Sequence, residues 1–149
     1  MGTWSADILG GDHPMDVLGT LGDIIMFTGE DAGLYPLEFT PQEAGGVRIL
    51  LETNATAVLD HKWDAEDYPV LAATYLSVGA EMPDAIRDAA LKQCREEAEE
   101  LRTTNAIGWK QPEERIAVLE NHAKLIEQHA PGKITPITHK GLFETMGVV

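Results

Sequence analysis

Residues 70–78 read VLAATYLSV, a run in which apolar side chains occur at nearly every position. A helix that is apolar on all sides must be covered by other elements, so this segment is expected to lie at the centre of the fold. Pro69 falls in its first turn, where a missing N–H costs nothing, and Gly79 is a common helix stop. The segment therefore predicts a short, buried helix around which the rest of the chain packs.

Helical patterns flank this segment on both sides. The first two are expected over residues 12–25 and 40–59, and the last two over residues 83–104 and 112–129. Gly45-Gly46 followed by Val47 could instead begin a turn and a strand, but the helical spacing of apolar residues continues to Leu59. Five helices with short links predict an all-α fold, a single-domain bundle. Its helical domain should span residues 1–132, and residues 133–149 should form an irregular C-terminal tail.

The chain has 149 residues and a formal net charge of −14, from 25 acidic and 11 basic side chains. Nucleic-acid affinity comes largely from Lys and Arg, so direct binding to DNA or RNA is not expected. Two explanations of the charge stay open: an acidic surface that keeps the protein soluble, or a field that steers a basic partner. The single cysteine and the lack of a signal peptide or a long apolar run predict a cytoplasmic protein without membrane contact.

The chain also resembles a family of small bacterial and phage-borne domains of unknown function that begin Met-Gly-Thr-Trp-Gly. The positions that carry the resemblance are Met1, Gly2, Thr3, Trp4, Asp12, Asp16, Leu18 and Trp109. Ser5 and Gly11 depart from the family, which has Gly and Asn there. The resemblance implies an all-α fold and supplies no reaction. It directs attention only to the segment around Trp4 and Asp12.

Two acidic clusters are candidate cation sites. The first contains Asp12, His13 and Asp16, and the second contains Asp60, His61, Asp64, Glu66 and Asp67. A bound metal normally needs three or four ligands at defined spacing, and neither cluster has a His-x-x-x-His or Glu-x-x-His pair. Carboxylates at helix starts also complement the helix dipole. That explanation is favoured, and neither a metal nor another cofactor is expected.

Three further side chains lie on the apolar sides of predicted helices. His122 and His129 are seven residues apart on the last helix, about 10.5 Å and too far for one metal ion. They are expected either at the edge of the core, each with one hydrogen bond, or in a contact surface. Cys94 falls on the buried stripe of its helix and is expected to be an inert thiol.

No catalytic constellation is evident in the sequence, so a non-catalytic protein-binding module is the preferred hypothesis. It would engage a basic partner as an inhibitor, immunity-like or anti-defence factor does. The residues expected to form the contact are Trp4, Asp12, Asp16, Glu96, Glu99 and Glu100. One alternative is a small hydrolase or ligand-binding domain that depends on a divalent cation. Another is a homo-oligomer whose contact includes His122 and His129.

Overall fold

The structure, a computed structural model of the chain, describes residues 8–10, 12–27, 33–105, 108 and 110–137. Within these residues every regular element is helical and there is no strand, which confirms the all-α expectation. The elements are α1 (Asp12–Ile24), α2 (Pro41–Thr53), α3 (Ala55–Asp60), the 3-10 helix η1 (Ala65–Asp67), α4 (Tyr68–Val78), α5 (Asp84–Thr103) and α6 (Pro112–Gln128).

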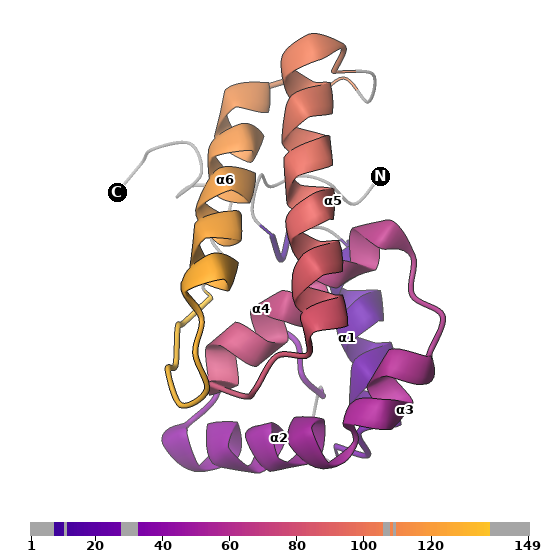
Figure 1. Cartoon of the computed structure of the whole chain (residues 1–149), viewed down its shortest axis with the longest axis vertical. Coiled ribbons are helices and arrows are strands. Elements are labelled where there is room, and N and C mark those ends of the chain that lie inside the picture. Colours follow the sequence, from indigo (N-terminus) through magenta and orange to yellow (C-terminus); the bar gives the residue numbers. More distant parts are fainter. Residues whose placement is uncertain (1–7, 11, 28–32, 106–107, 109, 138–149) are drawn as a thin grey trace.

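Helix α4 is the centre of the molecule. All of its residues from Pro69 to Val78 are buried, as its continuous apolar sequence predicts. It packs against α1, α2, α5, α6 and η1. Figure 1 shows α4 between α2, which lies across the bottom of the view, and the upright pair α5 and α6. The helix ends at Gly79, whose φ of 73° lies in the left-handed region that glycine tolerates.

Helices α5 and α6 form a long antiparallel hairpin over α4 (Figure 1). The buried stripe expected around Cys94 is present along α5. Its members are Ile86, Ala90, Cys94, Ala98 and Leu101, and all are buried. On α6, Leu119, Ala123 and Ile126 are buried, whereas Ile116 at the start of the stripe is only partly so.

The single helix predicted for residues 40–59 is wrong, because the structure divides it into α2 and α3. The capping box at its start is present: Thr40 Oγ1 accepts from Glu43 N–H at 3.2 Å, and Glu43 Oε1 accepts from Thr40 N–H at 2.9 Å. The division falls at Asn54, which has φ −103° and ψ 24°. Its Nδ2 donates to Leu50 O at 2.8 Å and approaches Ile25 O at 3.5 Å. Asn54 therefore ends α2 and ties the start of α3 to the end of α1, which makes six α-helices among the described residues instead of about five.

Two histidines, one within α6 and one just after it, form hydrogen bonds with main-chain oxygens at the two ends of α4. His122 Nε2 lies 2.8 Å from Pro69 O in the first turn of α4, and His129 Nε2 lies 2.7 Å from Ala80 O just beyond its last turn. A carbonyl oxygen only accepts, so Nε2 donates in both pairs. Both histidines are buried. The expectation of core histidines with one hydrogen bond each is therefore confirmed.

The chain after α6 continues around the same end of α4. Gly132 N–H donates to Gly79 O, and Thr135 N–H donates to Leu76 O, both at 2.8 Å. Ile137 is buried as well. Residues 133–137 have no regular element, but they pack on α4 and the α2 side of the molecule.

Burial lowers the pKa of His122 to about 4 from its ordinary value of 6.5, a nearby Arg115 charge adds to this, and the hydrogen bond to Pro69 opposes it. The unfolded chain therefore takes up a proton near pH 6.5 that the folded protein takes up only near pH 4. It follows that the stabilising contribution of neutral His122 is full above pH 6.5 and is lost as the pH falls toward 4.

We expect the depressed pKa of His122 to lower the free energy of unfolding by about 2 kcal/mol when the pH falls from 7 to 5. Urea unfolding of the wild type and of His122→Gln at the two pH values measures this. Glutamine can still donate to Pro69 O but does not titrate, so the difference in unfolding free energy between the two proteins should shift by that amount in favour of the variant. Parallel pH profiles would contradict the assignment.

Candidate functional site

The negative charge is divided unevenly along the chain. Residues 1–83 hold 14 of the 25 acidic side chains and only two of the 11 basic ones, Arg48 and Lys62. Residues 84–149 hold the other 11 acidic and nine basic side chains. The first part therefore carries a formal charge of −12 and the second part −2. Almost all of the net negative charge therefore belongs to the first 83 residues.

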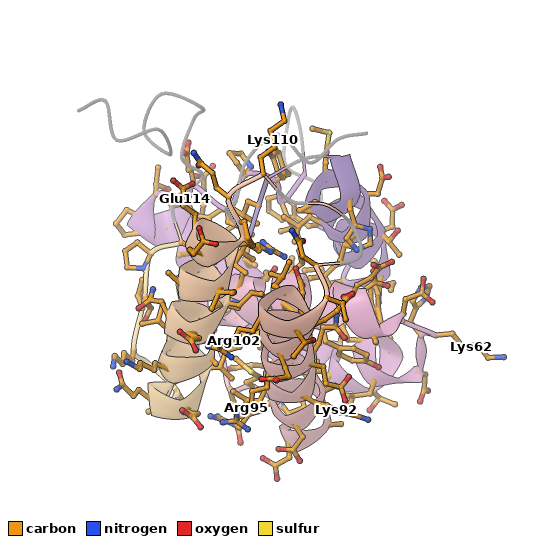
Figure 2. The ribbon with its side chains drawn as sticks, turned by 90° about the horizontal axis from the view of Figure 1, so that it is seen from above. Lys62, Lys92, Arg95, Arg102, Lys110 and Glu114 are labelled. Atoms are coloured by element: carbon orange, nitrogen blue, oxygen red, sulfur yellow. The ribbon has the colours of Figure 1, made fainter. Side chains whose placement is uncertain are left out.

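Three of the six basic side chains on α5 and α6 form ion pairs between the two helices. Three ion pairs cross the hairpin: Arg95–Glu127, Arg102–Glu120 and Arg115–Glu97. Figure 2 shows Arg95 and Arg102 lying between the two helices, whereas Lys62 projects away from the body. The Arg115 pair is the most enclosed, with side chains only 15% and 17% exposed and two contacts of 2.9 and 3.3 Å. A forked pair of this kind is stronger and more specific than a single contact.

A groove of about 480 Å³ runs between α5 and α6, and its charges balance. Three basic side chains line it, Arg95, Arg102 and Lys124, and so do three acidic ones, Glu99, Glu120 and Glu127. Cys94 also lines it but is buried, and burial raises the pKa of its thiol to about 12. A protonated, enclosed thiol is a poor nucleophile, as expected for this position.

The predicted contact residues on α5 are partly neutralised. Glu96 lies 4.0 Å from Lys92, and Glu99 lies 3.7 Å from Arg102. Glu100 is partly buried and makes no ion pair with another described residue. Asp16 is exposed on α1, whereas Trp4 and the side chain of Asp12 lie outside the described residues. Helix α1 packs mainly on α3 and α4, and α5 on α4, α6 and η1, so Asp16 and the three glutamates belong to different parts of the surface.

Five unneutralised carboxylates lie on the side of the molecule formed by α1, α3 and residues 61–67. We call this surface the acidic face and define it by Asp16, Asp23, Asp60, Asp64 and Glu66. All five are exposed, and none lies within 4.0 Å of a basic side chain of the described residues. Asp16 and Asp23 are two turns apart on α1, about 10.5 Å, and therefore project from the same side of that helix.

Two contacts hold this face together. At one end, the Asn54 amide approaches Ile25 O and joins α3 to α1. At the other end, His13 Nε2 lies 2.9 Å from Asp67 Oδ1 and joins α1 to η1. Residues 54–67 therefore run alongside α1, on the right of Figure 1. The two acidic clusters of the sequence thus meet in one region.

The buried carboxylate of Asp67 holds α1 and the start of η1 together. Its Oδ1 pairs with His13, and its Oδ2 accepts from Asp64 N–H at 2.8 Å. Within the part of the chain that the structure describes, no group of three or more His, Cys, Asp or Glu side chains could hold a metal ion. The alternative of a cation-dependent enzyme or ligand-binding domain stays a prediction.

Apolar side chains lie among the carboxylates of the acidic face. Met15 is 49% exposed beside Asp16, and Leu59 is 43% exposed beside Asp60. Trp63 is partly buried, and its Nε1 donates to Val58 O at 2.8 Å, so it anchors the segment after α3. Carboxylates beside apolar side chains suit lysine and arginine, whose long stems are apolar and whose ends are charged.

Comparison of this chain with protein families, curated proteins and solved structures found no match. The family resemblance noted in the sequence therefore stays a prediction. Among the described helices, none is both long enough and apolar enough to cross a bilayer.

The enclosed Arg115–Glu97 pair should matter far more for stability than the exposed pairs. We expect Glu97→Gln to lower the free energy of unfolding by about 2 kcal/mol, because it removes the carboxylate that faces the enclosed Arg115 charge. Glu99→Gln on the same helix is the matched control and should change it by less than about 0.5 kcal/mol. Urea unfolding at pH 7 measures both. Equal effects of the two substitutions would show that the pair is not an anchor of the hairpin.

Proposed function

We propose that this protein is a non-catalytic binding module that engages a basic surface of another protein through the acidic face. The observation that carries the proposal is the set of five exposed carboxylates on α1, α3 and residues 61–67 that have no basic neighbour among the described residues. An inhibitor, immunity-like or anti-defence factor acts in this way. The proposal includes action in the cytoplasm as a single-domain helical bundle.

Electrostatics favours a basic protein over other macromolecules. A formal charge of −12 in the first 83 residues repels phosphate backbones and attracts lysine and arginine. Exposed ion pairs contribute only about 0–1 kcal/mol each, so their main effect is on the rate of encounter and on partner choice. The exposed Met15 and Leu59 supply apolar area that carboxylates alone lack.

One edge of the acidic face borders α5. Because η1 packs against α5, residues 64–66 lie close to the helix that carries Glu96, Glu99 and Glu100. We therefore include Asp12 and Asp16 in the primary contact and these three glutamates at its border, with Trp4 as a further contact. Ion pairing predicts that the border contributes less than the acidic face, since Glu96 and Glu99 already face basic side chains.

Affinity capture from the lysate of the native host tests the proposal. Three baits are compared at about 50 and 500 mM NaCl: the wild type, a face variant and a border variant. The face variant carries Asp16→Asn, Asp60→Asn, Asp64→Asn and Glu66→Gln, and the border variant carries Glu96→Gln, Glu99→Gln and Glu100→Gln. Asp64 contributes its main-chain N–H to the Asp67 contact, which asparagine keeps.

We expect a basic protein on the wild type at low salt, its loss at high salt, strong reduction on the face variant and weaker reduction on the border variant. Circular dichroism of the purified baits shows that all three are folded. A capture that recovers no basic protein at low salt, or one that the face variant retains in full, would contradict the proposed function.

A further inference from the structure

A second groove lies on a different part of the molecule, between the loop before α2, the start of α2 and the segment after α6. Its volume is about 480 Å³. Most of its lining is apolar: Leu37, Phe39, Pro41, Ala44, Ile134 and Ile137. Ile134 is 55% exposed, so apolar surface is left open to a partner. The volume is within the range of small-ligand and side-chain pockets.

The walls of this groove are fixed by main-chain hydrogen bonds. Leu37 N–H donates to Leu34 O at 2.7 Å, which holds the loop before α2. Thr135 N–H donates to Leu76 O at 2.8 Å, which holds the segment after α6 on the end of α4. A preformed groove of this kind loses little conformational entropy when a partner enters.

The charged side chains among the described lining residues of this groove are both acidic. Glu38 and Glu43 line it and are exposed, and none of its lining residues is basic. Glu43 accepts from Thr40 N–H, but no ion pair neutralises it among the described residues. The α5–α6 groove has the same volume and balanced charges, so the two grooves differ in what they attract. An anion at the start of α2 would meet Glu38 and Glu43, which excludes phosphate or carboxylate as the natural occupant.

We propose that this groove binds an extended peptide segment of a partner protein, with an apolar side chain in the groove and a neighbouring lysine or arginine on Glu38 and Glu43. Charge complementarity decides the occupant, since two carboxylates border an apolar floor that lacks a basic side chain. A second copy of this chain is a poor fit, because a molecule of charge −14 repels itself at an acidic groove. The groove shares with the proposed function only a basic partner and uses different residues.

Titration of the isotope-labelled full chain with a synthetic peptide, followed by ¹H–¹⁵N NMR, tests this inference. The probe is acetyl-Lys-Leu-Lys-Leu-Lys-Leu-amide at about 150 mM NaCl. We expect shift changes centred on residues 37–44 and 134–137. A peptide of the same charge with serine in place of leucine should bind about tenfold more weakly, because the apolar contact is lost.

Two double variants separate local recognition from general attraction to an acidic protein. Glu38→Gln with Glu43→Gln should weaken the probe about fivefold, and glutamine at position 43 keeps the capping box. Asp16→Asn with Asp60→Asn, on the acidic face, should change binding by less than about twofold. Equal loss of peptide affinity in both double variants would overturn the proposal, and so would chemical-shift changes elsewhere on the surface. No shift change at millimolar peptide would also overturn it. Shift changes at the groove when the free protein is concentrated would point to self-association instead and would overturn it as well. Failure of the lysate capture would leave these readouts unaffected, so the two proposals can fail separately.

Discussion

The fold depends on the burial of α4, a helix without a polar side. Such a helix is stable in water only when every side is covered, and α1, α2, α5, α6 and η1 supply that cover. The polar main-chain atoms at its ends must also be satisfied, because an unpaired buried carbonyl costs free energy comparable to a lost hydrogen bond. His129 meets that need for Ala80 O just beyond the last turn, and His122 adds a donor to Pro69 O in the first turn. Helix α6 therefore contributes both apolar cover and the two donors that fix the position of α4.

The packing of helices around α4 also determines which charged side chains can form ion pairs. Helices α5 and α6 lie side by side, so three of their arginines reach glutamates on the other helix and form ion pairs with them. Helices α1 and α3 are shorter, and their part of the chain contains few basic residues with which their carboxylates could pair. The result is a hairpin joined by three ion pairs, and an acidic face whose five carboxylates have no basic neighbour among the described residues. The proposed binding side rests on this difference and not on the net charge alone.

The sequence predicts those features that depend on local spacing. The buried α5 stripe, the central α4, its stop at Gly79 and the Thr40 capping box all follow from patterns within a few turns of helix. The break at Asn54 does not, because apolar spacing continues through it and the deciding hydrogen bond reaches Ile25 in another helix. For the same reason Arg87 and Arg95 look like outer-face residues in the sequence, yet they contact Ile126 O and Glu127 on α6. Asp16 was predicted for the binding site, whereas the acidic face around it depends on how α1 meets the segment after α3, which no local pattern specifies.

Carboxyl labelling tests the division of charge most directly, and it requires no partner. Glycine ethyl ester, coupled with a carbodiimide, modifies free and accessible carboxylates faster than those engaged with arginine, and peptide mass spectrometry gives the rate at each position. Fast labelling of Asp16, Asp23, Asp60, Asp64 and Glu66, with slow labelling of Glu97, Glu120 and Glu127, is the result that this account predicts. Equal rates in the two groups, or faster labelling of the α5–α6 glutamates, would contradict it.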